Sequence, residues 1–327
     1  MKALYIEKDD SYSVKLKNIN IEDITKYQDP TDFLQIKVLY STINYKDALA
    51  ITNKGKIIRN FPLVPGVDFI GSIRQSCNEK FPIDKNILVT GFGYGEKYFG
   101  GLSEYTFVKP EHAVLLPETL DPKKIISLGT AGFTAMLCVD KITNYLKPEN
   151  GTILVTGSTG GVGSLTIHLL SKLGYKVAAI TGKANQEKIL QNLGAKEVIS
   201  REEFNSNYRT LDKASYAGAI DVLGGKTLST ILSRINYNGH SVICGLAEDF
   251  KLETTVMPFI LRGVTLHGVD SVSYPVEQRL NIWEKYLNLI DESYYENLIT
   301  EISLENVIEA SEKIISASKV GRYIVKL

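Results

Sequence analysis

The sequence predicts an α/β protein with a β-rich first part and a doubly wound parallel sheet in its second part. Up to about residue 120, short runs such as MKALYIEK and FLQIKVLYST show the alternation typical of strands. Beyond that point, apolar runs such as TILVTG and YKVAAI alternate with amphipathic segments of about a dozen residues. Such alternation indicates a parallel sheet with helices on both faces.

The first part contains three further predicted strands, VDFIGSI, NILVTGF and LSEYTFVK. The segment PKKIISLGTAGFTAMLCVDKITNYL then has the apolar spacing of a helix and is closed by Pro148 and Gly151. At the end of the chain, a helix around ENVIEASEKII and the strand RYIVKL are expected to return to the first domain.

The second part reads as a regular succession of strands and helices. In chain order the predicted elements are TILVTG, the helix VGSLTIHLLSKL, YKVAAI, the helix QEKILQNL, KEVIS, AGAIDVL, the helix TLSTILSRI, HSVICG and VTLHGV. Gly174 and Gly194 follow the first two of these helices, where glycine commonly ends a helix. The sequence shows no internal repeat and no low-complexity linker.

Composition excludes several classes of protein. The chain has 327 residues, of which 44% are hydrophobic and 23% charged, and its formal net charge is zero, which disfavours a nucleic-acid or anionic-membrane partner. No run approaches the roughly 18 uncharged apolar residues of a membrane span. The start, MKALYIEKDD, becomes charged too early for a signal peptide, and Cys77, Cys138 and Cys244 are scattered and odd in number. We therefore expect a cytoplasmic protein with reduced thiols.

Four glycines, Gly157, Gly160, Gly161 and Gly163, lie in VTGSTGGVGS, between a predicted strand and a predicted helix. A turn of this kind presents backbone N–H groups and the positive end of the helix dipole, which favour a phosphate. The spacing G-x-x-G-G-x-G departs from the usual G-x-G-x-x-G, and a tight turn packed on the sheet is the alternative. The context favours dinucleotide binding, with Thr159, Gly160, Gly161 and Val162 as cofactor contacts.

The end of the next predicted strand indicates which dinucleotide is bound. An acidic residue there would bind the ribose 2′-hydroxyl of NAD, but this sequence has Thr181, Gly182 and Lys183. Lysine suits the 2′-phosphate of NADPH, and Arg201, after the third strand, offers a second positive charge. The alternative for each cation is a solvated surface charge. The pattern favours NADPH.

Longer blocks of the sequence resemble a known family. The blocks are INYKDALAITNKGKIIRNFPLVPGVDFIG, GTAGFTAMLCV, NLGAKEVISREEF, AGAIDVLG, TTVMPFILRGVTLHGVDSV and GRYIVKL. They resemble the YhdH/AcuI family of the zinc-free quinone oxidoreductase type, within the medium-chain dehydrogenase/reductase superfamily. The resemblance implies a GroES-like catalytic domain, a Rossmann domain, and reduction of the C=C bond of acrylyl-CoA by NADPH.

The residues themselves argue against zinc. Zinc-dependent members of the superfamily carry Gly-His-Glu in the first domain, but the matching stretch PGVDFIG has Val67 and Asp68 instead. The upstream ligand position falls in NYKD, which has no cysteine. Three cysteines cannot form a four-cysteine site, and the four histidines show no ligand-like spacing (His112, His168, His240 and His267). We therefore expect no metal.

The resemblance also implies an active-site residue, Tyr45 in NYKD, beside the nicotinamide. Its hydroxyl would either position the cofactor or donate a proton, and a packed aromatic at a strand end is the alternative. Asn44 and Asp47 are expected to shape this loop through turn hydrogen bonds. The basic stretch NKGKIIRN suggests contacts to coenzyme A phosphates, with a solvated loop as the alternative (Lys54, Lys56 and Arg59).

In the second domain, Leu246 and Ile260 resemble residues that line the nicotinamide side of the cofactor, with core packing as the alternative. Ser271 is carried over as a further cofactor contact. Near the final helix the family commonly has an asparagine, where this chain has Ala317. A contact made there by an amide side chain would be absent.

The expected division places residues 1–123 and 270–327 in the GroES-like domain and residues 124–269 in the Rossmann domain. By resemblance, the strand VTLHGV is expected at a sheet edge that forms a homodimer. A quinone or alkenal reductase using NADPH remains the nearest alternative activity. A non-enzymatic NADPH-binding protein is a more remote one, and a nucleic-acid-binding role is disfavoured by the zero net charge.

Overall fold

The computed structural model describes residues 1–183 and 185–327. The chain forms two compact units. Unit 1 comprises Met1–Thr130, Val272–Asn281 and Tyr295–Leu327, and unit 2 comprises Ala131–Ser271 and Ile282–Tyr294. Three helices run from one unit into the other along the chain: α3 (Pro122–Thr143), α9 (Val276–Leu287) and α10 (Glu292–Leu298).

Unit 1 is built on β-sheets. Its strands are β1 (Lys2–Lys8), β2 (Tyr12–Asn18), β3 (Leu34–Thr42), β4 (Asp68–Gln75), β5 (Asn86–Thr90), β6 (Tyr105–Val108), β7 (Val114–Leu115), β14 (Ile299–Ser303) and β15 (Arg322–Lys326). β1 and β2 form an antiparallel pair, and the others form a seven-stranded sheet in the order β14-β15-β3-β4-β5-β7, with β6 on β3. Its helices are α1 (Glu22–Thr25), α2 (Tyr45–Ile51) and α11 (Val307–Ile315), with 3₁₀ turns at Pro30–Asp32, Pro110–His112 and Leu304–Asn306.

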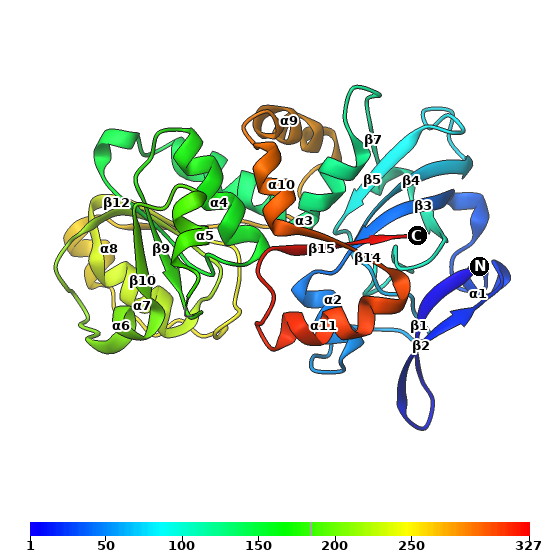
Figure 1. The fold of residues 1–327 in the computed structure, drawn as a ribbon, viewed down its shortest axis with the longest axis horizontal. Helices are drawn as coiled ribbons and strands as arrows, with labels where there is room; N and C mark the ends of the chain where they lie inside the picture. The colour runs from blue at the N-terminus through cyan, green and yellow to red at the C-terminus, as the bar shows by residue number, and fades with distance from the viewer. Residues whose placement is uncertain (184) are drawn as a thin grey trace. The chain divides into compact units, whose positions relative to one another are not determined.

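Strand β3 is central to this sheet because two strands, β6 and β15, pair with different halves of one of its edges. Its first half pairs with β6, and its second half, Tyr40–Thr42, pairs with β15 from the end of the chain. β14 lies beside β15 in parallel (Figure 1). The expected return of the C-terminal segment to the β-rich part is therefore confirmed.

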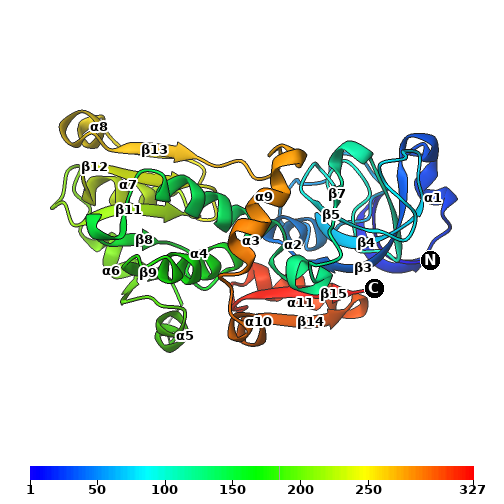
Figure 2. The ribbon, with the colours of Figure 1, turned by 90° about the horizontal axis from the view of Figure 1, so that it is seen from above.

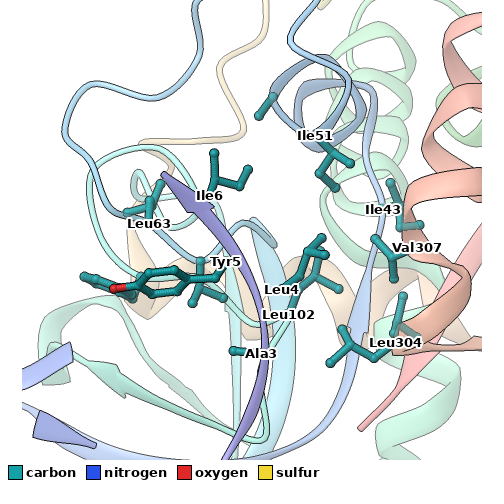
Figure 3. Close-up of a cluster of buried hydrophobic side chains, with 14 of the residues drawn as sticks. Ala3, Leu4, Tyr5, Ile6, Ile43, Ile51, Leu63, Leu102, Leu304 and Val307 are labelled. Atoms are coloured by element: carbon teal, nitrogen blue, oxygen red, sulfur yellow. The ribbon is translucent and has the colours of Figure 1, made fainter. Parts of the chain in front are cut away.

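The core of unit 1 joins segments that are distant in sequence. Leu4 and Ile6 of β1 are fully buried beside Ile51 of α2 and Val307 of α11 (Figure 3). The alternation of strand β1 accounts for part of this arrangement, since Leu4 and Ile6 share one face. Helices α2 and α11 pack together in the same cluster.

Unit 2 contains a six-stranded sheet in which every neighbouring pair is parallel. Its strands are β8 (Ile153–Val155), β9 (Val177–Thr181), β10 (Glu197–Ser200), β11 (Tyr216–Asp221), β12 (Ile235–Ile243) and β13 (Thr265–Gly268). The order is β10-β9-β8-β11-β12-β13. Numbered within the sheet this is 3-2-1-4-5-6, the Rossmann order, whose switch point lies between β8 and β11.

Helices connect the parallel strands. They are α4 (Gly161–Lys172), α5 (Glu187–Asn192), α6 (Arg201–Ser206), α7 (Gly225–Arg234) and α8 (Met257–Arg262), with a 3₁₀ turn at Pro148–Asn150. Phe204 of α6 and Ile231 of α7 pack on Leu154 and Ala178 of the sheet. In Figure 2, β13 is the last strand at one end of the sheet, and α8 lies near its start.

Several elements differ from the sequence-based expectation, and the helices α6, α8, α9 and α10 were not predicted. NYKDALAI forms the helix α2 rather than a strand end followed by a loop. β12 begins at Ile235, five residues before the predicted HSVICG. The long helix α3 is interrupted at Gly129, where φ is 49° and ψ is −151°.

Among the described residues, α3 is the one helix with the length and hydropathy that a membrane span would need. Its mean hydropathy is 1.4, and 78% of its most apolar window is buried inside the structure. Core helices pass the same test. This finding is weak evidence for a span.

Candidate functional site

The glycine-rich turn lies at the carboxyl end of β8, next to the switch point of the sheet. Gly160 is the N-cap of α4, with an extended backbone (φ −85°, ψ 174°), and Gly161 is the first helical residue. The first N–H groups of a helix have no partner within it, so they are available to a phosphate. Gly160–Val162 are only partly buried, whereas Thr159 is buried.

Two of the glycines are required by close backbone packing. At Gly163, an added Cβ would lie 2.4 Å from the carbonyl oxygen of Gly157 and 2.8 Å from the Cα of Ser158. Gly157 has a φ of 57°, and a Cβ there would lie 2.3 Å from Val222. At Gly160 the nearest atom to an added Cβ is 3.3 Å away. Gly163 and Gly157 therefore set the shape of the turn, while a Cβ at Gly160 would make a tight contact that a small shift could relieve.

A buried polar pair lies beneath this turn, and the sequence analysis missed it. The carboxylate of Asp221, at the end of β11, accepts hydrogen bonds from Thr156 Oγ1 (2.6 Å) and from the N–H of Gly224 (2.7 Å). Burial raises the pKa of Asp221 to about 6. The pair joins β8 to β11 at the switch point. The sequence did contain a signal for this pair, because the apolar strand AGAID ends with an acidic residue, Asp221.

The predicted 2′-phosphate residues come together at the end of β9. The N–H of Lys183 donates to Oγ1 of Thr181 (3.1 Å), and an added Cβ on Gly182 would lie 3.0 Å from Nη2 of Arg201. Arg201 is the first residue of α6. Burial lowers the pKa of Lys183. Arg201 thus lies beside the segment that carries Thr181 and Lys183, and these residue types fit a phosphate.

Three more predicted contacts belong to unit 2. Leu246 and Ile260 are 67% and 71% exposed, so the alternative of core packing is wrong for both. Ser271 is buried, and its hydroxyl forms a 2.7 Å hydrogen bond with Thr134 of α3. The glycine turn and the corner at Thr181–Lys183 follow the carboxyl ends of β8 and β9, where dinucleotides bind, and Leu246 follows the carboxyl end of β12. Ile260 lies in α8, which precedes β13.

Tyr45 belongs to unit 1, where it is the first residue of α2 and 49% exposed. The alternative of a packed aromatic is therefore wrong. The helix start is fixed by Asp47, whose carboxylate accepts the N–H groups of Asn44 (2.9 Å), Gly66 (3.0 Å) and Val67 (3.0 Å). The expected turn role of Asn44 and Asp47 is confirmed. Burial raises the pKa of Asp47 to about 6.

Asp68, which the resemblance places at the Glu position of the zinc-dependent motif, uses its carboxylate to accept several hydrogen bonds. It accepts from Asn44 Nδ2 (2.7 Å), Thr42 Oγ1 (3.0 Å), and the N–H (2.7 Å) and hydroxyl of Thr130. The break in α3 makes this possible, because a Cβ at Gly129 would lie 2.4 Å from Asp68 Oδ2. Within the described residues, no group of three or more His, Cys, Asp or Glu side chains is arranged to hold a metal ion.

The remaining predicted positions lie at the surface of unit 1. Lys54 and Lys56 are exposed, and Arg59 pairs with Glu96 at 3.2 Å. Ala317 adopts the left-handed conformation with a φ of 54°. Asparagine is favoured there. The asparagine that the resemblance implies for this position would suit this backbone conformation.

Comparisons with known protein families agree with both units. Residues 30–118 match the family described as "Alcohol dehydrogenase GroES-like domain", and residues 161–292 match "Zinc-binding dehydrogenase".

Three curated relatives are similar over nearly their full length. "Probable acrylyl-CoA reductase AcuI" of Escherichia coli is 44% identical, with 100% of each chain covered. "Putative quinone oxidoreductase YhfP" of Bacillus subtilis is 41% identical, covering 99% of this chain and 98% of that protein. "Acrylyl-CoA reductase AcuI" of Ruegeria pomeroyi is 36% identical, with the same coverage.

Solved structures have the same fold. The yhdH oxidoreductase of Salmonella enterica in complex with NADP has a TM-score of 0.95 at 43% identity, with 100% of both chains covered. B. subtilis yhfP with NAD bound has a TM-score of 0.92 at 40% identity, covering 100% of this chain and 99% of that one. With similarity of this extent in sequence and fold, the chain belongs to the YhdH/AcuI family of the medium-chain dehydrogenase/reductase superfamily.

Proposed function

We propose that this protein catalyses the NADPH-dependent reduction of the C=C bond of acrylyl-CoA to propanoyl-CoA. The observation that carries the proposal is the full-length similarity to two relatives named acrylyl-CoA reductase, at 44% and 36% identity. Similarity that covers at least 98% of each chain supports a shared reaction more strongly than a single motif does.

The cofactor pyrophosphate would bind the N–H groups at the start of α4, around Gly160 and Gly161. Thr181, Lys183 and Arg201 would hold the 2′-phosphate. Support comes from the proximity of Lys183 to Thr181 and of Arg201 to Gly182, and from the absence of an acid at Thr181–Lys183 in the sequence. A carboxylate there would repel the phosphate, so this corner favours NADPH over NADH.

When bound, NADPH supplies the hydride that reduces the β-carbon of the C=C bond. Leu246 and Ile260 would offer apolar surface to the nicotinamide, and Ser271 a polar contact. Tyr45 would position the cofactor through its hydroxyl. The hydrogen bonds of Asp47 to Asn44 and Gly66 hold the start of α2, and with it the backbone of Tyr45, in place. The proton for the α-carbon comes from water in this scheme.

The coenzyme A phosphates would contact Lys54 and Lys56 after α2. Lys54 also lines a hollow of about 620 Å³ between α2 and α11. That hollow has mixed charge, since Glu309 and Glu312 line it as well. The two exposed lysines rather than the hollow therefore carry this part of the proposal.

The domain assignment proposed from the sequence is a GroES-like catalytic domain at 1–123 and 270–327 and a Rossmann domain at 124–269. We also propose a cytoplasmic homodimer. The position of β13 at the end of its sheet supports pairing with a second copy, and three free cysteines suit a reducing compartment.

The test is NADPH oxidation followed at its absorbance band with acrylyl-CoA, crotonyl-CoA, a quinone and a simple enal. We expect the highest kcat/KM with acrylyl-CoA, and propanoyl-CoA as the product by mass spectrometry. The double variant with Lys54→Ala and Lys56→Ala should raise the KM for acrylyl-CoA and leave the KM for the enal unchanged. Equal turnover of the enal and the thioester would contradict the proposal.

One observation favours a second function. The B. subtilis relative at 41% identity is named a putative quinone oxidoreductase. In the same assay, a higher kcat/KM for the quinone than for either thioester would establish that activity instead.

A further inference from the structure

Two histidines on neighbouring strands of unit 2 form a pair that the activity proposed above does not use. Nδ1 of His240, in β12, lies 3.0 Å from Nε2 of His267, in β13, so one nitrogen donates a hydrogen bond to the other. The ring planes are within 23° of parallel. The phenol ring of Tyr145, in the turn after α3, stacks on both imidazoles, with centroids 4.5 Å from His240 and 4.8 Å from His267. Three segments of unit 2 thus meet in this cluster.

Strand β13 has few other side-chain anchors. It is four residues long, it lies at one end of its sheet, and none of its four residues is buried. Leu266 packs on the core of the unit as a partly buried side chain, and the backbone pairs with β12 over His240–Ile243. Edge segments with little buried apolar surface open most easily. The contacts of His267 are therefore a substantial part of what holds this strand.

The hydrogen bond between the histidines depends on how many protons the pair carries. A neutral imidazole has one N–H donor and one acceptor nitrogen, whereas an imidazolium has two donors and no acceptor. One added proton leaves one ring neutral, so the facing nitrogens still share a hydrogen bond. Two added protons place an N–H on both facing nitrogens, and the bond is replaced by repulsion between like charges.

The surroundings of the pair oppose the second proton. Burial lowers the pKa of His240, and the neighbouring imidazole of His267 lowers it further. Burial also lowers the pKa of His267, and the ammonium of Lys141 in α3 adds to this effect. Tyr145 covers the rings from the same side of the chain. Of the residues that the structure describes, Lys141 is the one charged side chain whose field reaches either imidazole, so no carboxylate offsets the added charge.

We propose that the His240–His267 pair is a pH switch that controls how firmly β13 is held on β12. While the two rings share a hydrogen bond, they join the edge strand to β12 under the ring of Tyr145. When both rings are protonated, two imidazolium ions face each other beside Lys141, and β13 separates from β12 more often.

The direction of the pH dependence follows from the two lowered pKa values. An unfolded chain binds these protons near the ordinary value of 6.5, whereas the folded protein binds them at lower pH. The unfolded or opened state therefore carries more protons as the pH falls. The stabilising contribution of the pair is complete above about pH 6.5 and is lost progressively below it. Because the two rings interact, they titrate as a pair.

Hydrogen–deuterium exchange by mass spectrometry, corrected for the intrinsic rate at each pH, measures the opening of β13 between about pH 7.5 and 4.5. In the wild type, peptides covering Thr265–Gly268 should exchange about tenfold faster at the acid end. His267→Phe keeps a ring for Tyr145 to stack on but does not titrate, so this rise should be absent. His112→Phe, at a ring-stacked histidine of unit 1, should behave as the wild type does. Peptides covering β8, inside the same sheet, should not change.

A second variant separates the switch from a general loss of stability. Lys141→Gln removes the cation that lowers the pKa of His267, so the pair is protonated at higher pH. The midpoint of the rise in β13 exchange should move up by about 0.2–0.7 pH units, the range for an exposed pair of charges. The same acid response in the wild type and in His267→Phe would overturn the proposal, and so would an unmoved midpoint in Lys141→Gln. If His267→Phe exchanges rapidly at every pH, the midpoint of Lys141→Gln decides.

Assembly gives a further readout, which rests on the homodimer proposed above. If two copies pair through β13, light scattering should show the mass falling toward the 36.3 kDa of one chain over the same pH range. His267→Phe should then stay dimeric. A strand β13 that opens while the dimer persists would place the interface elsewhere, and the switch itself would stand. None of these measurements uses turnover, so a failure to reduce acrylyl-CoA would overturn the proposed function alone.

Discussion

At the scale of single residues, Tyr45 has two chemically distinct roles open to it, and its position in the structure favours one. The residue begins α2 and is half exposed, while the nearest lysine in sequence, Lys46, is paired with Glu96 at 2.8 Å. Lys46, the lysine next to Tyr45 in the chain, therefore already has an acidic partner in Glu96. A positioning role fits this arrangement better than that of a general acid.

Replacing Tyr45 with Phe removes only the hydroxyl. We expect a higher KM for NADPH and a kcat within about tenfold of the wild-type value, because the enolate of a thioester can take its proton from water. Steady-state kinetics with each substrate varied would measure both constants. Tyr27→Phe, at another exposed tyrosine of unit 1, is the control. A fall of roughly 10²–10⁴ in kcat with an unchanged KM would instead assign Tyr45 as the acid.

Lys183 tests the cofactor preference. Lys183→Glu sets a carboxylate against the 2′-phosphate and removes a charge-assisted contact of roughly 1.5–3 kcal/mol. The ratio of kcat/KM for NADPH to that for NADH should fall at least about tenfold. Lys188→Glu, at an exposed position on α5, should leave the ratio unchanged. Equal losses with both cofactors would remove Lys183 from the phosphate site.

Asp221 gives a prediction for pH. Burial raises its pKa from 3.8 to about 6, so the folded state favours the protonated acid. Its stabilising contribution is complete below about pH 3.8 and is lost as the pH rises through about 6. Asn does not titrate, so the free energy of unfolding of the wild type minus that of Asp221→Asn should fall by roughly 1–3 kcal/mol between pH 4 and 6.5.

Urea unfolding of both proteins across this pH range would measure that difference. Equal m values would show that the same transition is being compared. A difference that stays constant with pH would mean that the pKa of Asp221 is the same in the folded and unfolded states.

At the scale of elements, the sequence predicted the regular parts of the Rossmann unit well, because each apolar strand is followed by a glycine or an amphipathic helix. It missed α2, which is only seven residues long. Asn44 and Asp47 were assigned to a turn, and they do hold the turn that starts this helix. The pair Asp221–Thr156 was also missed, because the contact joins strands that are 65 residues apart in sequence.

The glycine turn can be tested as an element by two matched substitutions. Gly163→Ala should lower the free energy of unfolding by about 1–3 kcal/mol, because its Cβ would lie 2.4 Å from Gly157 O. Gly160→Ala meets its nearest atom at 3.3 Å and has a negative φ, so it should lower the free energy of unfolding by less than Gly163→Ala does. Both should raise the NADPH Kd, since both change the phosphate cradle.

Denaturant unfolding and cofactor titration of the two variants would separate packing from binding. Equal destabilisation by both would contradict the assignment of Gly163 to helix–turn packing. An unchanged Kd in Gly160→Ala would move the phosphate away from this turn.

At the scale of the whole molecule, the sequence predicted that the last segment of the chain returns to the β-rich part. The antiparallel pairing of β15 with β3 confirms this prediction. The signal was the short strand RYIVKL near the end of the chain. Pairing partners were not predictable, because β3 shares one edge between β6 and β15, an arrangement that depends on long-range contacts. The oligomeric state also depends on long-range contacts, because these contacts decide which strand edges and apolar faces remain uncovered.

The proposed homodimer follows from the uncovered end of the Rossmann sheet. β13 is the last strand in that sheet, and the neighbouring segment exposes Val256 (65%) and Leu261 (51%). Exposed apolar side chains beside a sheet edge are a common mark of an interface. Light scattering should give a mass twice the chain's 36.3 kDa, and Leu261→Lys should shift the protein toward that single-chain mass. Ile83→Lys, at an exposed apolar residue of unit 1, should remain dimeric. A wild-type mass of one chain at micromolar concentration would contradict the dimer, and a dimeric Leu261→Lys would place its interface elsewhere.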